Sequence, residues 1–303
     1  MHSGFRRFLL IAIPYAWLFV LFLVPFLIVV KISLSDLAIA QPPYVPTFDI
    51  SAGWEGLKSF VSGLDFESYV WLAEDSIYID AFLSSLQIAI SSTVLALIVA
   101  FPMAYGMARA PDWLRPLLVM GVILPFWTSF LIRVYAWIGI LRSEGLLNQF
   151  LLWTGIVSEP LQIMNSTTAV YIGIVYSYLP FMVLPIYSTL EKMDESLLEA
   201  AIDLGCSRVS AFWSVTLPLA MPGIIAGCFL VFIPAMGEFV IPDLLGGSRT
   251  LMMGKTLWNE FFSNRDWPVA SAVAIVLLLT LVVPIVIFQR QAEREAERQR
   301  EGV

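Results

Sequence analysis

Residues 81–108 read AFLSSLQIAISSTVLALIVAFPMAYGMA, a run of apolar and small side chains that contains no Asp, Glu, Lys or Arg. Three further stretches, 8–30, 160–190 and 269–288, are equally free of these charged residues. A helix of about 20 apolar residues crosses the roughly 30 Å hydrocarbon layer of a bilayer, and each stretch reaches that length. The sequence therefore predicts a polytopic membrane protein built of helices.

The amino-acid composition excludes several classes of protein. Hydrophobic residues make up 59% of the 303-residue chain and charged residues 14%, whereas soluble domains hold roughly 45–50% and 25%. The one histidine, His2, argues against a histidine-based metal site and a Ser-His-Asp triad. Cys206 and Cys228 fit neither a metal-ligand spacing nor a disulfide framework. The net charge of −7 argues against nucleic acid as a partner.

Two more membrane-spanning segments emerge when a single charge is tolerated. Residues 116–141 carry only Arg133, and residues 209–237 are uncharged as far as Glu238. We therefore predict an all-α fold with six transmembrane helices, at 8–30, 81–105, 117–140, 168–190, 219–241 and 269–288.

The first of these segments also has some features of a signal peptide. Arg6 and Arg7 precede it, and Ala38-Ile39-Ala40 resembles a cleavage site. Its apolar stretch of 23 residues, 8–30, is longer than the roughly 7–15 residues of a signal-peptide core. We therefore expect a helix that is not cleaved.

The distribution of charge predicts the orientation in the membrane. With both termini in the cytoplasm, ten Lys and Arg residues lie on the cytoplasmic side and six on the outer side, as the positive-inside rule favours. The cytoplasmic side also holds ten acids and is neutral, whereas the outer side, with Glu238, holds fourteen and has a net charge of −8. The outer acids are either ordinary soluble loops or an anionic vestibule that concentrates cations.

We expect one transmembrane domain followed by a short tail. The helical bundle covers 1–288, and its external loop, 31–80, is too short for an ordinary independent domain and is expected to cap the helices. Residues 289–303 form a cytoplasmic tail in which Glu and Arg alternate at helical spacing, as in a solvated helix end.

The cytoplasmic loop 191–217 is too polar to span a membrane and has strong helix signals. Ser196 and Glu199 have the spacing of a capping box, which predicts a helix from about Leu197. Gly205 is placed to end that helix. A second short helix is expected to begin at Ser207, and Pro218 is expected to stop it before the fifth span.

The same loop resembles the EAA loop of bacterial ABC-importer permeases. Glu199-Ala200-Ala201 is followed after three residues by Gly205, and after nine more by Val215, where the family pattern has Ile. Leu217-Pro218 completes the pattern. The resemblance implies a type I ABC-importer permease fold and a coupling helix that docks on a separate ATP-hydrolysing subunit. The residues implied in this coupling are Glu199, Ala200, Ala201, Gly205, Leu217 and Pro218.

We expect this chain to bind no cofactor of its own. Gly254-Lys255-Thr256 resembles the end of a phosphate-binding P-loop, but that motif requires a glycine at the position of Arg249. The segment also lies on the predicted outer side, where ATP is scarce. ATP and Mg²⁺ are therefore expected on partner ATPase subunits.

Further stretches resemble the polyamine-importer branch of these permeases, and within it the putrescine-type systems. One of them is PAMGEFVIPDLLGG at 234–247; the others are 125–137, 176–187, 222–232 and 265–268. The resemblance implies a non-catalytic permease of the bacterial inner membrane that moves putrescine or spermidine by alternating access. The implied partners are a second homologous permease, two ATP-binding subunits and an external polyamine-binding protein.

Polyamine chemistry suggests which residues line the path. Ammonium groups separated by methylenes call for carboxylates and for aromatic faces, which attract cations by about 0.5–2 kcal/mol. Acids near a membrane core are functional candidates. We expect Glu238 and Asp243 to attract the ammonium groups, and Trp127, Tyr135 and Tyr178 to line the path. The alternative is an interfacial aromatic belt with loop acids.

Arg133 is unexpected in a path for cations. It could reach toward the membrane surface, form an ion pair with Glu238 or another acid, or act as a barrier in the closed pore.

Other functions remain open at this point. An ABC permease for iron, thiosulfate or another amine fits the coupling loop equally well. A secondary transporter or channel working alone would need no docking loop, and a membrane enzyme would need clustered catalytic groups in its spans, such as HExxH, which the chain lacks.

Overall fold

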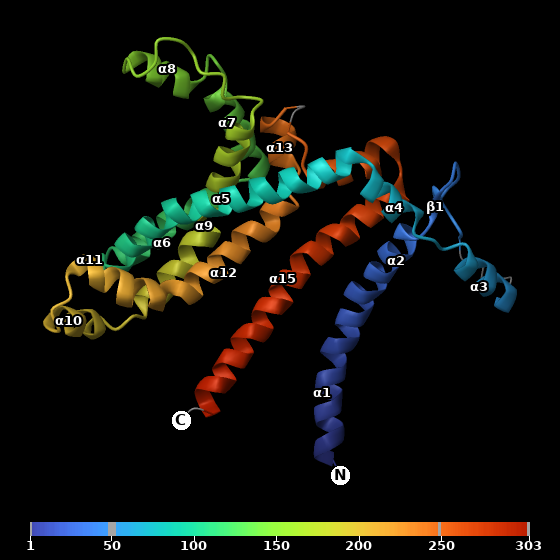
Figure 1. The fold of residues 1–303 in the computed structure, drawn as a ribbon, viewed down its shortest axis with the longest axis horizontal. Coiled ribbons are helices and arrows are strands. Elements are labelled where there is room, and N and C mark those ends of the chain that lie inside the picture. Colours follow the sequence, from blue (N-terminus) through green and yellow to red (C-terminus); the bar gives the residue numbers. More distant parts are fainter. Residues whose placement is uncertain (1, 48–52, 248–249, 302–303) are drawn as a thin grey trace. The chain divides into compact units, whose positions relative to one another are not determined.

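Helices form almost all of the protein in a computed structural model that describes residues 2–47, 53–247 and 250–301 (Figure 1). The chain divides into two compact units. The first contains Met1–Asp80 and Thr256–Val303, and the second contains Ala81–Lys255.

The first unit is built around two long helical segments. Helix α1 (His2–Leu18), the π-helical turn η1 (Phe19–Leu23) and α2 (Val24–Ser33) follow one another without a break, and Leu10–Ser33 is apolar and long enough to cross a membrane. Helix α15 (Trp267–Glu301) packs against α2.

The predicted external loop 31–80 forms small elements within this unit. Strands β1 (Asp36–Leu37) and β2 (Tyr44–Val45) pair antiparallel, with Asp36 opposite Val45. Helices α3 (Gly53–Ser62) and α4 (Glu67–Glu74) follow, and α4 packs against α15. The Tyr44 and Trp267 rings lie 6.2 Å apart, so the loop is attached to the start of α15.

The second unit is a bundle whose core is formed by α5 (Ser76–Ala108), α9 (Thr167–Glu191) and α12 (Leu217–Met236). Helices α9 and α12 pack closely because Gly223 and Gly227 present no side chain to α9. A Cβ atom at Gly223 would lie 2.5 Å from the Thr189 hydroxyl oxygen, and one at Gly227 would lie 2.8 Å from the Met182 sulfur. This G-x-x-x-G spacing is typical of close helix packing in membranes.

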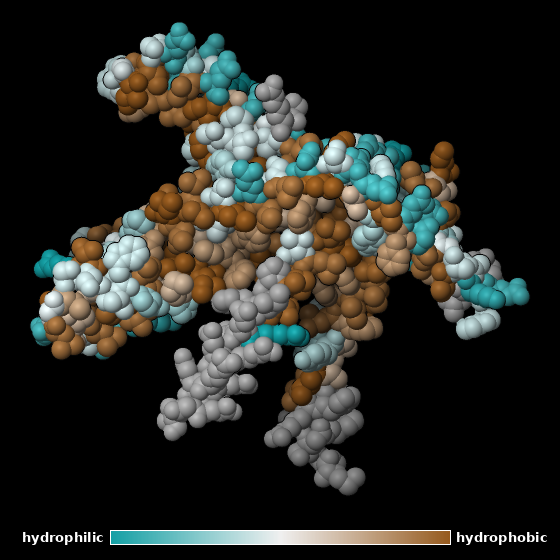
Figure 2. Space-filling model, in the orientation of Figure 1, coloured by the Kyte–Doolittle hydropathy of each residue, from teal (hydrophilic) through white to brown (hydrophobic). Residues whose placement is uncertain are grey.

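The outward faces of these helices are apolar. Leu83, Ile90, Val94 and Ile98 of α5 are all exposed, and Figure 2 shows brown, hydrophobic surface over the long helices. Within the described ranges, four helices are apolar and long enough to cross a membrane, with a fifth if one bent pair is a single span. Such surface suits lipid or other membrane helices rather than water.

The predicted third span, 117–140, is not one continuous helix. Helix α6 (Arg115–Ile123) passes into the 3₁₀ turn η3 (Leu124–Trp127), and α7 (Phe130–Leu141) begins after an extended Thr128. The two arms, Arg115–Trp127 and Phe130–Trp153 with α8 (Leu146–Trp153), are bent by 90°. Pro125 has no N–H for an α-helical bond, which favours a break here.

The prediction that Pro218 stops a helix was wrong. Helix α11 (Arg208–Ala211), the π-helical turn η4 (Phe212–Thr216) and α12 form one run from Arg208 to Met236. Pro218 lies in the first turn of α12, where a missing N–H is tolerated.

The last two predicted spans also differ in their limits. The fifth helix ends at Met236 rather than at residue 241, and α13 (Val240–Leu245) follows it. The sixth lies in α15, whose apolar part within the described residues is Trp267–Val283. Arg249 and residues 302–303 of the predicted tail lie outside the described residues.

Candidate functional site

Of the residues predicted to couple to an ATPase, Glu199, Ala200, Ala201 and Gly205 lie on α10 (Ser196–Asp203) and the turn that follows it, and Leu217 and Pro218 begin α12. The predicted capping box was wrong, because Ser196 is already helical and Glu195 is the N-cap without a side-chain bond. The Asp194 carboxylate instead accepts a 2.9 Å hydrogen bond from the Ser196 backbone N–H. This bond holds the pKa of Asp194 below its ordinary value.

Gly205 ends α10 as the sequence predicts. Its φ of +92° is in the left-handed region, which favours glycine. The N–H of Gly205 donates to the Ile202 carbonyl at 2.9 Å, and the N–H of Cys206 donates to the Ala201 carbonyl at 3.1 Å. These two bonds form a Schellman motif, and Ser207 then caps α11 through the Ser210 N–H, as expected.

The loop presents apolar side chains beside its small residues. Leu204 is 87% exposed, and Leu197, Val209 and Trp213 are exposed as well. Glu199 and Ala200 are exposed, and Ala201 is half-buried. An exposed apolar patch on a short, well-capped helix is the kind of surface that binds another protein.

A cluster of aromatic rings connects this loop to the end of α5. The Phe212 ring lies 5.7 Å from Phe101 and 5.8 Å from Tyr105, edge to face in both cases. Leu217 packs against the bundle core, whereas Pro218 is exposed. A displacement of the loop would therefore act directly on α5.

Glu238 is a buried carboxylate between α12 and α13, and only 6% of its surface is exposed. Its Oε1 accepts hydrogen bonds from the backbone N–H groups of Phe239 (3.1 Å), Val240 (3.0 Å) and Ile241 (3.3 Å). Its Oε2 accepts one from the Tyr178 hydroxyl of α9. The structure thus brings Tyr178 and Glu238 together. All four donors are neutral, and no Lys or Arg of the described residues forms an ion pair with Glu238.

Asp243 differs from Glu238 in being exposed and already paired. Its carboxylate lies 3.2 Å from the Lys255 ammonium, which also donates to the Gly247 carbonyl. This partner lies on α14 (Met253–Trp258) and could not be predicted from the sequence.

The other two predicted path residues are exposed aromatics away from this pair. Trp127 is 80% exposed at the break between α6 and α7, and Tyr135 is 58% exposed on α7. Neither makes a hydrogen bond or ring contact with Tyr178 or Glu238 in the described part of the chain.

Arg133 stacks on aromatic rings instead of forming an ion pair. Its guanidinium carbon lies 4.8 Å from the Phe126 ring centre and 5.8 Å from that of Phe130. No carboxylate of the described residues lies within ion-pair distance. Phe126 packs on Phe181 at 5.1 Å, and Phe181 on Tyr178 at 6.2 Å, so a chain of rings leads from Arg133 toward Glu238. Phe126 and Phe181 lie in stretches that resemble the polyamine-importer branch, 125–137 and 176–187, but neither was predicted to line the path.

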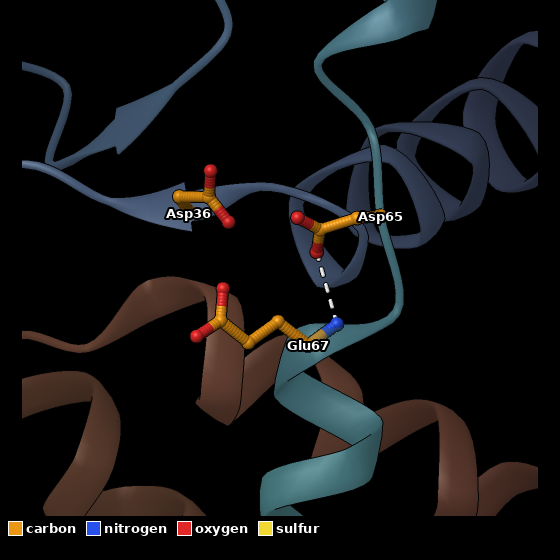
Figure 3. A group of neighbouring side chains, drawn as sticks. All are labelled: Asp36, Asp65 and Glu67. Carbon is orange, nitrogen blue, oxygen red and sulfur yellow. Dashed lines mark hydrogen bonds between the residues drawn. The ribbon is translucent and has the colours of Figure 1, made fainter.

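Acidic residues of the first unit gather around a cavity of about 530 Å³. Trp71 and four acids line it: Asp36, Glu67, Glu74 and Asp266. Carboxylate oxygens of Asp36, Asp65 and Glu67 lie within 4.8 Å of one another, and Asp65 accepts a 2.9 Å hydrogen bond from the Glu67 N–H (Figure 3). The sequence predicted acidic outer loops but not this convergence.

Asp266, one of the acids that line this cavity, has a raised pKa. Its carboxylate accepts a 3.0 Å hydrogen bond from the Val269 N–H and so caps α15. Burial raises the pKa of Asp266 above its ordinary value of 3.8, and the charge of Glu260 adds to the effect. Glu260 itself is buried and accepts a 2.9 Å hydrogen bond from the Tyr78 hydroxyl.

Comparison with known proteins links these features to transport. A family described as binding-protein-dependent transport system inner membrane components matches residues 5–294. The spermidine/putrescine transport system permease protein PotB of Salmonella typhimurium (strain SL1344) is 44% identical over 216 residues, 71% of this chain and 75% of that protein. PotB of Haemophilus influenzae (strain ATCC 51907 / DSM 11121 / KW20 / Rd) is 39% identical over 280 residues, 92% of both chains.

The fold is shared with a solved transporter. A chain from the crystal structure of a bacterial ABC transporter involved in the import of the acidic polysaccharide alginate superposes with a TM-score of 0.65. The match covers 95% of this chain and 96% of that one, at 18% identity. This likeness confirms the predicted type I permease fold.

Proposed function

The chain belongs to the family of binding-protein-dependent transport system inner membrane components, and from this premise we propose that it is the permease subunit of an ATP-driven polyamine importer. The observation that carries the substrate is the 39% identity to a spermidine/putrescine permease over 92% of both chains. As a member of this family, the chain is a transport subunit and not an enzyme.

The buried carboxylate of Glu238 supports a cationic substrate. Its four hydrogen bonds come from neutral groups, and no Lys or Arg of the described residues forms an ion pair with it. An ammonium group would supply the missing opposite charge, and a charged hydrogen bond in a low-dielectric site is strong. Asp243 would contribute only after an ammonium displaces Lys255.

The exposed aromatics Trp127 and Tyr135 complete the proposed path. Both side chains are largely exposed. We infer that they line the passage once a second permease forms the opposite wall of that passage. The acid-lined cavity of the first unit supports the vestibule hypothesis, because clustered carboxylates attract polyvalent cations.

The proposed assembly contains a second homologous permease, two ATP-binding subunits that carry ATP and Mg²⁺, and an external polyamine-binding protein. The exposed surface of α10 and Gly205 is the proposed dock for an ATPase, and Leu217 and Pro218 join that dock to α12. ATP binding would move the loop, and the bundle would alternate between inward-facing and outward-facing states. We place both termini, with the tail 289–303 after the 1–288 domain, in the cytoplasm of a bacterium.

The test is ATPase stimulation in the complete complex reconstituted in liposomes. Loaded with putrescine or spermidine, the cognate binding protein should stimulate ATP hydrolysis and uptake of labelled polyamine. A panel with iron, thiosulfate and amino acids should give no stimulation. Stimulation by one of those solutes and not by polyamines would replace the proposed substrate with another of the same transporter class.

A further inference from the structure

A second cavity, of about 540 Å³, lies in the other unit among α5, α6, α7 and α9. Its walls are almost wholly apolar, and they include Met103 and Met107 of α5 and Leu117 and Leu118 of α6. Arg133 is the one charged side chain of the described residues that lines it. The proposed path to Glu238 makes no use of this cavity.

Arg133 lacks the partner that a buried cation needs. Only 8% of the residue is exposed, and its Nε has no hydrogen-bond partner. The Phe126 and Phe130 rings offset part of the lost hydration, but a buried charge ordinarily pairs with an opposite charge. No described residue of this chain supplies that charge. We infer that the anion comes from outside the described residues.

The walls of the cavity leave room for another helix. Gly106 of α5 and Gly121 of α6 both line it, and a Cβ atom added to either would meet nothing within 4 Å. Small residues on membrane helices allow a neighbouring helix to approach closely. The cavity therefore combines space for a helix with a cation that lacks a partner.

We propose that this cavity receives a membrane-spanning helix of the second permease subunit, and that a carboxylate on this helix pairs with Arg133. The inference rests on the proposed function, because it requires a second permease. A lipid would fill the space with acyl chains, but its charged headgroup stays at the membrane surface. Because acyl chains carry no charge, such a lipid would leave Arg133 without an opposite charge.

The experiment measures how much of the second permease co-purifies with this chain from the complete complex. Gly121→Leu fills the open wall, and Arg133→Met removes the cation while keeping much of the bulk. Each should lower recovery of the second permease by about tenfold or more, because a charge left unpaired in a buried interface weakens binding strongly. Gly139→Leu is the matched control, since Gly139 is also exposed with open space but does not line the cavity.

A photoreactive residue in place of Leu117 identifies what occupies the cavity. Cross-linking to the second permease supports the proposal, whereas cross-linking to lipid alone overturns it. Arg133→Glu should abolish pairing, and an Arg in place of one buried acid of the second permease should restore it. If no such exchange restores co-purification of the second permease, the proposal that a carboxylate pairs with Arg133 is wrong.

The outcomes separate this inference from the proposed function. If no second permease co-purifies with the unmodified chain, the proposed heteromeric importer fails. If it does co-purify, and Gly121→Leu and Arg133→Met behave like Gly139→Leu, only the inferred interface fails. Elution of each variant chain as a single folded species in detergent distinguishes lost pairing from misfolding.

Discussion

At the scale of single residues, Glu238 shows how the oxygens of a buried carboxylate are satisfied without a neighbouring cation. Three backbone N–H groups at the start of α13 and the Tyr178 hydroxyl satisfy its oxygens. Hydrogen bonds to a charged group contribute about 1.5–3 kcal/mol each, more than those between neutral groups. Asp243 has a different environment, because Lys255 already neutralises it.

The first prediction concerns these two acids. Glu238→Gln combined with Asp243→Asn should reduce polyamine uptake by the assembled transporter at least tenfold, because both negative charges are lost while size is kept. Glu238→Gln alone should account for most of the loss, and Tyr178→Phe should give a smaller one. Uptake of labelled putrescine into proteoliposomes measures this effect.

Glu159→Gln serves as the control, because it removes an exposed acid of the predicted outer side. Its uptake should match that of the unmodified protein. Unchanged uptake in the folded, assembled double variant would remove Glu238 and Asp243 from the path.

The second prediction concerns the pH dependence of stability through Asp266. The pKa of Asp266 is raised in the folded protein, so the charged form of this carboxylate destabilises the fold. The contribution of Asp266 to the free energy of unfolding therefore falls as the pH rises above the ordinary value of 3.8. Asp266→Asn removes the charge and retains the cap on α15, since Asn is an equally good N-cap. The variant should therefore be at least as stable as the unmodified protein at pH 7, and any advantage should shrink toward pH 4.

Thermal unfolding in detergent across this pH range measures the difference. Asp266→Ala is the comparison, because it loses the hydrogen bond to Val269 and should be destabilised by about 1 kcal/mol. If the stability of Asp266→Asn relative to the unmodified protein is lower at pH 7 than at pH 4, the predicted sign of this pH dependence is wrong.

At the scale of elements, the coupling loop is a short rigid helix with an exposed apolar edge. The Asp194 bond starts α10, the Schellman motif at Gly205 ends it, and Phe212 attaches the next turn to α5. The loop is thus held at both ends while Leu204 and Val209 remain exposed. A rigid and exposed element of this kind can transmit a displacement from a partner into the bundle.

The third prediction tests that element. Gly205→Val should weaken binding of the ATPase subunit and abolish ATP-driven uptake, because a β-branched residue at φ +92° distorts the loop and costs about 1–3 kcal/mol. Ala200→Leu should have a similar effect on docking without backbone strain, since Ala200 is exposed. Co-purification of the ATPase measures the first effect, and uptake the second.

Gly155→Val is a matched control, since Gly155 also has a positive φ, of +71°, and open space around it, but lies outside the coupling loop. Equal loss of ATPase binding in Gly155→Val and Gly205→Val would point to general instability. Normal binding and uptake in Gly205→Val and Ala200→Leu would refute the coupling role.

At the scale of the whole molecule, the chain consists mainly of apolar helices that carry few charged residues. Its long helices expose apolar side chains, Arg133 lacks a counter-charge among the described residues, and the aromatics Trp127 and Tyr135 are exposed. These unsatisfied features are expected of one subunit of a larger membrane assembly rather than of a transporter that works alone.

The fourth prediction follows from that incompleteness. Reconstituted alone, the chain should neither hydrolyse ATP nor accumulate putrescine, with or without a proton or sodium gradient. Adding the second permease, the ATPase and the loaded binding protein should restore ATP-dependent uptake. Gradient-driven uptake by the chain alone, measured in the same liposomes, would favour a secondary transporter.

Features that depend on local chemistry could be predicted from the amino-acid sequence. Uncharged runs such as 81–108 predict membrane helices because transfer of apolar side chains into lipid depends on composition. Gly205 and Ser207 predicted the ends of neighbouring helices because caps involve residues only a few positions apart. The coupling-loop resemblance is likewise contained within one short segment.

Contacts between groups far apart in the sequence could not be predicted, because they depend on how the helices pack. Tyr178 and Glu238 are 60 positions apart, and the pairing of Asp243 with Lys255 depends on how α13 and α14 pack. The isolation of Arg133 in its cavity likewise follows from the arrangement of four helices. Hydropathy and capping act along the chain, whereas the charge environment of a buried group is set by every helix that surrounds it.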